Sequence, residues 1–282
     1  NRLYICMQKN KATSKNKFIS ERSKEGINSV NWIGVYTLFK REVMRFLKIY
    51  LQTILGPALT TLLFLIIFSM ALGRASKLVQ DIPFLEFLAP GLIIMAMIQN
   101  AFGNTSSSLL SAKVAGNITD LLLPPLTAVE FASAFLAGAI CRGLFVGASV
   151  SLLVLFFVPL KIYNPFTLIY FSILSCSFMG LLGLITGIWA SKFDHVAAIT
   201  NFIVTPLSLL SGTFYSITIL PKNFYLISQL NPFFYMIDGF RFSMIGYADS
   251  NIYLGGIILL ALNIFLYAVI IIMLKSGFKL KA

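Results

Sequence analysis

The chain has 282 residues, of which 58% are hydrophobic and only 11% are charged. Soluble domains carry roughly 25% charged residues, so this composition excludes an ordinary water-soluble domain and is typical of an integral membrane protein. The formal net charge is +12, but the positive residues gather near the ends of the chain and its middle is apolar. We therefore expect a lipid bilayer and no nucleic acid as a partner.

The N-terminal segment differs from the rest of the chain. Residues 1–30 are basic, rich in Ser and Asn and poor in large aliphatic side chains, so we expect them to be disordered. The next segment, residues 31–48, is typical of an amphipathic helix lying on an anionic membrane surface. Its apolar and basic side chains follow one another at helical spacing: Trp32, Val35, Leu38 and Phe39, then Lys40, Arg41, Arg45 and Lys48.

Six later stretches are long and apolar enough to cross the membrane. A helix needs about 20 residues to span roughly 30 Å of hydrocarbon, and none of the stretches alternates apolar with polar residues as a barrel strand would. The sequence therefore predicts an all-α polytopic membrane protein with one transmembrane domain over residues 31–274 and a basic tail, 275–282. The expected spans are residues 50–72, 87–109, 136–160, 166–190, 196–215 and 252–274.

The distribution of Lys and Arg predicts the orientation. If the N-terminus is cytoplasmic, sixteen of the 22 Lys and Arg residues lie on the cytoplasmic side and five on the other, with Arg142 inside a span. Cytoplasmic loops of membrane proteins carry an excess of these residues. We therefore expect both termini in the cytoplasm, which agrees with an even number of spans.

Residue types that catalysis or cofactor binding needs are sparse. A single histidine excludes a two-His metal site, and the three cysteines are too far apart for a disulfide or metal-ligand pattern. The sequence contains no GxxxxGK[ST] nucleotide-binding loop. Asp238 and Arg241, three residues apart, form either an acid/base pair or a contact along a helix at the membrane surface. We expect no catalytic, metal-binding or cofactor-binding residues.

The loop between the second and third spans, "AGNITDLLLPPL", predicts a short capped helix of about two turns. Asn117 can cap its start, and the helix dipole favours the acidic Asp120 at the third helical position. Pro124 ends the helix. Its apolar side chains fall on one face: Ile118, Leu121 and Leu122. Two interpretations stay open, a helix that rests on lipid and a helix that docks into a groove of a soluble partner.

Arg142 lies near the start of the third apolar stretch. Residues 143–160 alone make about 27 Å of helix, so the span can place Arg142 at the inner interface with its side chain reaching the lipid headgroups. The alternative is a charge that lines a transport path.

The stretch "LLSGTFYSITILPKNFYLISQLNPFFYMIDGFR" is too apolar for an exposed loop and too interrupted for one membrane helix. Backbone that is broken at membrane depth must be buried in protein or line a wet cavity. We expect two short helices that dip into the outer leaflet, either closing a path from outside or forming a static cap. The residues of this cap are Gly212, Phe214, Pro221, Phe224, Asn231, Pro232, Gly239 and Arg241.

Several stretches together resemble one family. They are "FLAPGLIIM" in the second span, "NITDLLLPPL" after it, "RGLFVG" in the third span, and "TPLSLLSGTFYSITILP" with "LNPFFYMIDGFR" near the end. Over about residues 31–274 the chain resembles membrane permeases of type-two ATP-binding-cassette (ABC) exporters. It is most similar to the bacterial inner-membrane branch that includes drug, nodulation-factor and polysaccharide exporters.

The resemblance implies a transporter subunit rather than an enzyme. Such permeases form dimers bound to two ATPase subunits, which bind the ATP, and a coupling helix after the second span carries the nucleotide signal. That role falls on residues 117–123. The expected function is export of a substrate across the bacterial inner membrane, with a lipid-linked glycan or polysaccharide as one alternative cargo. A membrane-embedded transferase and a channel are the alternatives from other classes.

Overall fold

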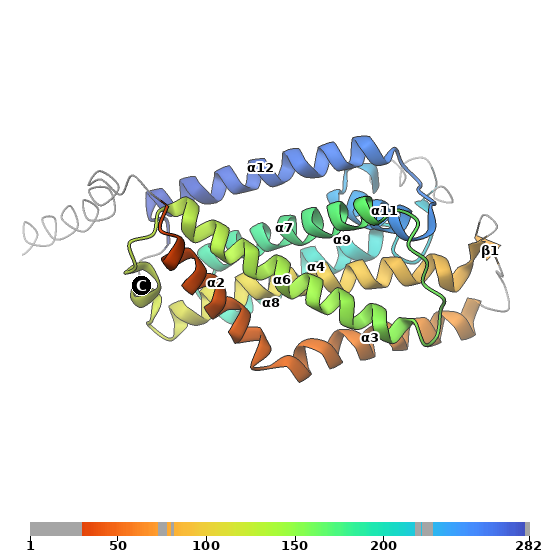
Figure 1. The fold of residues 1–282 in the computed structure, drawn as a ribbon, viewed down its shortest axis with the longest axis horizontal. Coiled ribbons are helices and arrows are strands. Elements are labelled where there is room, and N and C mark those ends of the chain that lie inside the picture. The colour runs from red at the N-terminus through yellow and green to blue at the C-terminus, as the bar shows by residue number, and fades with distance from the viewer. Residues whose placement is uncertain (1–29, 73–77, 80–81, 218–220, 222–227, 280–282) are drawn as a thin grey trace, which may run out of the picture.

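The computed structural model describes residues 30–72, 78–79, 82–217, 221 and 228–279. In this part of the chain the regular secondary structure is helical, apart from one hairpin of two strands with two residues each (Figure 1). Six helical segments are long and apolar enough to cross a membrane, which confirms the predicted all-α polytopic fold. The elements are α2 (Trp32–Leu47), α3 (Tyr50–Leu72), β1 (Leu78–Val79), β2 (Ile82–Pro83), α4 (Phe84–Val114), α5 (Ile118–Leu122), α6 (Ala128–Val154), α7 (Pro165–Trp189), α8 (Phe193–Ile199), η1 (Thr200–Val204), α9 (Thr205–Leu210), α11 (Pro232–Ile245) and α12 (Ile252–Ser276).

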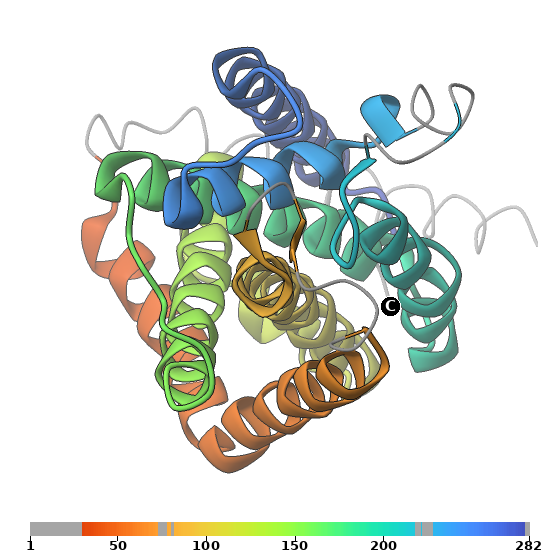
Figure 2. The ribbon, with the colours of Figure 1, turned by 90° about the vertical axis from the view of Figure 1, so that its right-hand side faces the viewer.

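Helix α4 is the centre of the bundle. Seen end-on, α3, α6, α7 and α11 surround it (Figure 2), and 72% of its apolar window is buried inside the protein, against 11% for the fifth spanning segment, Phe193–Leu210. Glycines bring α6 and α7 close to it. A Cβ added at Gly183 of α7 would lie 2.4 Å from the carbonyl oxygen of Phe102, and one at Gly147 of α6 would lie 2.5 Å from Sδ of Met97. Larger residues there would push the helices apart.

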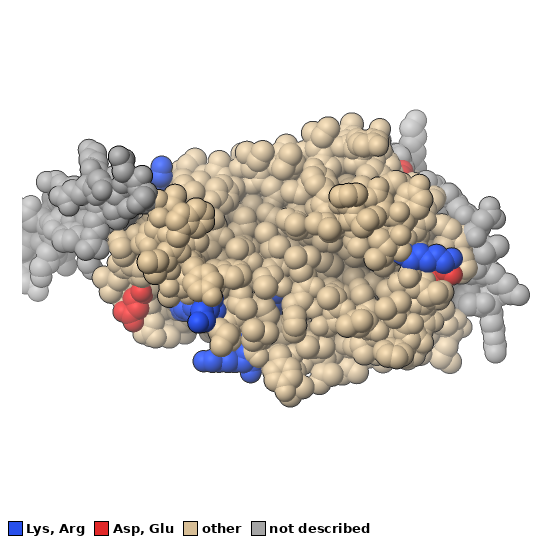
Figure 3. All heavy atoms as spheres, viewed as in Figure 1, with Lys and Arg blue, Asp and Glu red and all other residues tan. Residues whose placement is uncertain are grey.

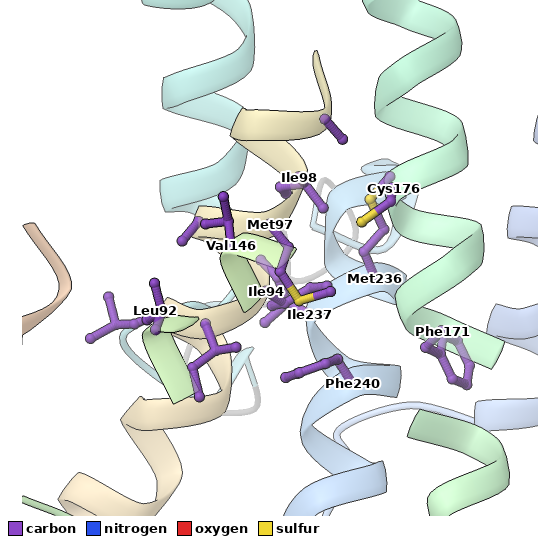
Figure 4. Close-up of a cluster of buried hydrophobic side chains, with 14 of the residues drawn as sticks. Leu92, Ile94, Met97, Ile98, Val146, Phe171, Cys176, Met236, Ile237 and Phe240 are labelled. Carbon is purple, nitrogen blue, oxygen red and sulfur yellow. The ribbon is translucent and has the colours of Figure 1, made fainter. Parts of the chain in front are cut away.

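The larger apolar core is formed by side chains of α3, α4, α6, α7, η1, α11 and α12. Figure 4 shows Ile94 and Met97 of α4 facing Met236 and Ile237 of α11, with Cys176 of α7 beside them. One side of α4 is therefore lined with apolar side chains from its neighbours. On the molecular surface, charged side chains visible in Figure 3 lie mostly toward the two ends, and the length between them is largely uncharged.

Helix α6 begins earlier than the hydropathy pattern indicates, at Ala128 rather than at residue 136. The reason is a capping box: the Thr127 hydroxyl accepts a hydrogen bond from the Glu130 N–H at 3.3 Å, and Glu130 accepts one from the Thr127 N–H at 2.7 Å. The two bonds satisfy N–H groups that a helix start otherwise leaves unpaired. The helix also ends earlier, at Val154 instead of residue 160.

The fifth spanning segment is not one uniform helix. It passes from α8 through the π-helical turn η1 into α9, where Thr205 N–H bonds to the Thr200 carbonyl. Pro206 follows directly and has no N–H to donate, so the regular α-helical bonding cannot continue there. The segment ends at Leu210 rather than at residue 215, and Gly212 then turns the chain with a φ of +75°.

Helix α2 lies against α6 with a buried face that is not wholly apolar. Asn31 caps it by accepting a hydrogen bond from Gly34 N–H at 2.9 Å. Leu38, Glu42 and Phe46 are buried, while Trp32 is 73% exposed. Except for Val30, the segment predicted to be disordered lies outside the described residues.

Candidate functional site

Helix α5 stands at one end of the bundle, next to the start of α2 and the end of α12 (Figure 1). Ile118 and Leu121 are buried against α2, α4, α6 and α7 in a second apolar cluster, and Leu122 packs on the same cluster. The prediction of an apolar face open to a partner is therefore wrong for Ile118 and Leu121, because the chain covers them itself, whereas Leu122 is half-buried. The residues that stay exposed are Asn117, Thr119, Asp120, Leu123 and Pro124.

The caps of α5 also differ from the prediction. Asn117 occupies the N-cap position, but its side chain makes no capping hydrogen bond to any described residue. The helix has five residues instead of about two turns. Its last bond, from the Leu123 N–H to the Thr119 carbonyl, measures 2.8 Å, and Pro124 follows directly, at the position where the prediction ended the helix. Leu123 is 65% exposed at this tip.

Glu130 ties the segment after α5 to α2. One of its carboxylate oxygens accepts a hydrogen bond from the Asn31 N–H at 2.7 Å, and the other accepts two from the N–H and hydroxyl of Thr127, at 2.7 and 3.0 Å. Asn31 also donates from its side chain to the Pro125 carbonyl at 3.4 Å. Sequence reasoning missed Glu130, although "TAVE" is a capping-box pattern.

At the other end of the bundle, α11 is a single helix that is buried on nearly every side. Asn231 caps it by accepting from the Phe233 N–H at 3.1 Å, and Pro232 occupies its first turn. Asn231 and Pro232 therefore mark where α11 begins. Asn231 also donates to the Leu207 carbonyl at 3.0 Å and to the Ser211 hydroxyl at 2.7 Å, which fixes α11 to the end of α9.

The predicted cap residues fall into different places. Gly212 does make a bend, and the ring of Phe214 lies 4.8 Å from that of Phe68 on α3. Gly239 makes no bend, because it lies inside α11 where an added Cβ would meet Phe171 at 2.2 Å. Pro221 is exposed, and Phe224 lies outside the described residues.

Asp238 and Arg241 do not form a surface pair. Both are buried, at 0% and 1% exposed. Arg241 donates a hydrogen bond to the Gly212 carbonyl and lies 3.9 Å above the ring of Phe87. Asp238 accepts from the N–H groups of Asp249 and Ser250 at 2.8 and 2.9 Å. Burial raises the pKa of Asp238, and the hydrogen bonds from the Ser250 hydroxyl and the Asp249 N–H oppose this rise. The pair joins two loops to α11 and is closed to an external substrate.

Arg142 lies about halfway along α6, roughly 20 Å from its start at about 1.5 Å per residue. Its guanidinium donates to the Asn100 side-chain carbonyl of α4 at 3.2 Å. The side chain thus turns into the bundle instead of extending along the helix to an interface, which corrects the placement expected from residues 143–160. The physical reason is the earlier start of α6, which moves Arg142 away from the helix end.

A polar cluster extends from Arg142 toward α2. Arg45 donates to the carbonyl and the side-chain oxygen of Asn104, at 2.6 and 3.0 Å, and to the Ser107 hydroxyl at 3.1 Å. It also forms an ion pair with Glu42 at 3.5 Å, and Glu42 accepts from the Ser108 hydroxyl at 2.7 Å. Burial lowers the pKa of Arg45, and the charge of Glu42 opposes this shift. We call these residues and Arg142 with Asn100 the arginine cluster.

Sequence reasoning missed most of the arginine cluster. One signal was present: Leu38, Glu42 and Phe46 recur at four-residue spacing, so Glu42 shares the apolar face of α2. An acidic side chain at such a position needs a buried partner. Among the described residues there is no group of three or more His, Cys, Asp or Glu that could hold a metal ion.

Comparisons with known proteins agree with these features. The family described as ABC-2 type transporter matches residues 34–245. The chain is 36% identical over 218 residues to the inner membrane transport permease YadH of Escherichia coli K12, covering 77% of this chain and 85% of that protein. It is 25% identical to nodulation protein J of Sinorhizobium fredii NGR234 over 230 residues, 77% of this chain and 82% of that protein. It is 22% identical to nodulation protein J of Rhizobium leguminosarum bv. viciae over 229 residues, covering 79% and 85%.

These matches favour a transporter subunit over the transferase and channel alternatives, since the relative with the highest identity of the three is a transport permease. The family match extends from α2 to the end of α11, and so includes α5, the arginine cluster and the elements around Arg241. The chain belongs to the ABC-2 type transporter family and is a transmembrane permease component of an ABC transporter.

Proposed function

We propose that this chain is the permease of an ABC export system in which two copies form the substrate path and each binds one ATPase subunit. The ATPase subunits bind and hydrolyse ATP, and the permease moves a substrate out of the cytoplasm across the inner membrane. Family membership supports the ATPase partner, and the printed name of the YadH relative supports the inner membrane. Export needs no bond to be made or broken in the permease, so a chain poor in catalytic residue types suits this role.

The orientation that we propose places the α5 end in the cytoplasm. This end carries most of the described basic residues outside the bundle interior, namely Lys40, Arg41, Lys48, Lys113, Lys192, Lys275 and Lys279. The opposite end, around α11 and the β-hairpin, carries Lys161 and the buried Arg241. An excess of Lys and Arg marks the cytoplasmic side.

We place a second copy of the chain against one poorly covered side of the bundle. In Figure 2, α3 and the segment Phe193–Leu210 flank one side of α4, and only 22% and 11% of their apolar windows are buried. Two such sides facing each other would place α4 of each copy beside a shared path. Native mass spectrometry of the purified transporter should then show two permease chains with two ATPase chains.

The observation that carries the coupling role is the exposed tip of α5. Ile118 and Leu121 anchor the helix in the bundle, so its opposite side and the exposed Leu123 are what a partner at this end meets. Glu130 connects the same segment to α2. A push on α5 by the ATPase would therefore reach α4, α6 and α2 together, and ATP binding would shift the dimer toward the state that the bound ATPase favours.

The test is Leu123→Asp in the intact permease–ATPase complex. A carboxylate buried without a partner in the contact costs several kcal/mol, and about 1.4 kcal/mol is tenfold in affinity. We expect normal amounts of permease in the membrane, at least tenfold weaker retention of the ATPase during co-purification, and loss of ATP-driven export.

Two further variants make the result specific. Leu155→Asp, at the other end of α6, should leave ATPase retention unchanged because that end faces away from the cytoplasm. Leu121→Asp should lower the amount of folded permease, since Leu121 is buried in the chain itself. If Leu123→Asp retains the ATPase and coupled export, α5 is not the docking element.

A further inference from the structure

The arginine cluster is built on one stripe of α4. Asn100, Asn104 and Ser107 recur at three- and four-residue spacing, and two guanidiniums reach this stripe from different helices. Arg142 comes from α6 to Asn100, and Arg45 comes from α2 to Asn104 and Ser107. The contacted asparagines are one helical turn apart, which is about 6 Å, so two cations lie near each other inside an apolar bundle.

The charges of the cluster do not balance. Glu42 and Arg45 form an ion pair at 3.5 Å. In the described part of the chain, no carboxylate oxygen lies within 4 Å of Arg142, and the one ion pair there is that of Arg45 with Glu42. The charge that acts on Arg142 is that of Arg45, which has the same sign. One guanidinium therefore stands without a counter-charge in a membrane-spanning helix, where cations are expensive unless they are paired.

The structure leaves room beside this cation. A Cβ added at Gly103, on the same side of α4, would meet no described atom within 4 Å. Gln99, Asn100, Gly103 and Ser107 are only partly buried, although most of α4 is buried. The opposite side of the helix holds Ile94 and Ile98 in the apolar core (Figure 4). The partly exposed strip of α4 thus contains the polar residues Asn100 and Ser107, which the two guanidiniums contact.

We propose that Arg142, with Arg45 and Asn100, binds an anionic phosphate group that enters along this open strip of α4. A guanidinium presents a planar fork of donors that matches phosphate oxygens and binds them more strongly than a neutral donor does. The phosphate supplies the negative charge that the chain does not. Its source is either the headgroup of an anionic lipid or a phosphate species from solution. The inference does not depend on export, because binding is measured directly.

The test uses the full-length permease, purified without lipid in a neutral detergent, and two probes. Phosphatidylglycerol is titrated and its bound copies are counted by native mass spectrometry, with phosphatidylcholine as the uncharged-headgroup comparison. Inorganic pyrophosphate is titrated separately and followed by its effect on the thermal midpoint. Arg142→Gln removes the cation. The matched control is Arg41→Gln, which removes the same charge from an exposed position on α2.

Asn100→Asp keeps the test independent of the fold. It places a carboxylate at the position 3.2 Å from the Arg142 guanidinium, so Arg142 gains an internal partner. The substitution removes the hydrogen bond that the Asn100 amide donates to the Ala96 carbonyl, and the new ion pair offsets this loss. We expect both Arg142→Gln and Asn100→Asp to weaken probe binding at least about tenfold, the size of one lost charge-assisted hydrogen bond. Arg41→Gln should bind as the wild type does, and Asn100→Asp should not lower the thermal midpoint.

The two probes separate the sources of phosphate. A loss of phosphatidylglycerol in both variants, with phosphatidylcholine unchanged, identifies a lipid headgroup. A loss confined to pyrophosphate identifies a phosphate species from solution. If neither probe distinguishes Arg142→Gln and Asn100→Asp from Arg41→Gln, the arginine cluster binds no phosphate and the proposal is wrong.

Discussion

Arg241 and Arg142 are both arginines inside the bundle, and their surroundings differ in charge. Arg241 is 1% exposed, lies 3.9 Å above the ring of Phe87 and bonds the Gly212 carbonyl, with the carboxylates of Asp238 and Asp249 acting on it. Arg142 bonds one amide oxygen, and the charge that acts on it is a second arginine. Both leave their Nε atom without a hydrogen-bond partner in the described part of the chain, so hydrogen bonding alone does not separate them.

Burial and nearby carboxylates distinguish a cation that stabilises the fold from one that is open to a ligand. The Arg241 site is closed and compensated, so it joins the turn after α9 to α11. The Arg142 site is half open and has excess positive charge. Substitutions at the two sites should therefore change stability by very different amounts.

Arg241→Met should show the largest loss of stability. It leaves the buried Gly212 carbonyl without its donor, which costs about 1–3 kcal/mol, and removes a desolvated cation–π contact of up to about 2 kcal/mol. We expect a total of roughly 3 kcal/mol and a clear fall in the thermal midpoint of the detergent-purified permease. A wild-type midpoint for this variant would show that the α11 end of the bundle does not depend on Arg241.

Gly239→Ala should show the next largest effect. The new Cβ would lie 2.2 Å from the Phe171 ring, and overpacking of this kind costs about 1–3 kcal/mol. Gly103→Ala is the matched control, since its Cβ meets no described atom within 4 Å and alanine favours a helix by up to about 1 kcal/mol. Thermal unfolding should rank the wild type between the two variants. Equal midpoints would contradict the packing shown between α7 and α11.

Glu42→Gln should cost about 1 kcal/mol. Glutamine can still accept the hydrogen bond of Ser108, but Arg45 loses its ion pair at 3.5 Å. The same substitution leaves two uncompensated cations in the arginine cluster. Phosphatidylglycerol or pyrophosphate should therefore bind more tightly to this variant while its thermal midpoint falls slightly, and weaker binding would count against the proposed phosphate site.

Arg142→Met should show the smallest effect on stability, within about 0.5 kcal/mol of the wild type or slightly stabilising, because an apolar side chain can replace a buried charge without loss. The measurement is the same thermal unfolding in the absence of added phosphate species. A fall as large as that of Arg241→Met would mean that Arg142 is a structural cation and would remove the contrast between the two sites.

Hydropathy alone was enough to locate six spanning segments, because each must be apolar over its whole length. Local chemistry would have improved the helix boundaries: "TAVE" starts the spanning helix α6, and Asn231 with Pro232 starts the shorter helix α11. The burial of Ile118 and Leu121 could not be predicted, since the sequence pattern of an apolar face is the same whether its own chain or a partner covers it. The meeting of Arg142 with Asn100 also depends on how two distant helices pack.

The π-helical turn η1 has a consequence for local stability. Its segment, Phe193–Leu210, has 11% of its apolar window buried inside the protein, and Pro206 removes one backbone donor just after the turn. Regions with few buried contacts and interrupted backbone bonding open at a small fraction of the global unfolding free energy. The backbone amides of this segment should therefore exchange their hydrogens sooner than those of α4, in which 72% of the window is buried. The bundle thus has a central helix whose amides exchange slowly. At its edge it has a segment that can change its local hydrogen bonding while the rest stays folded.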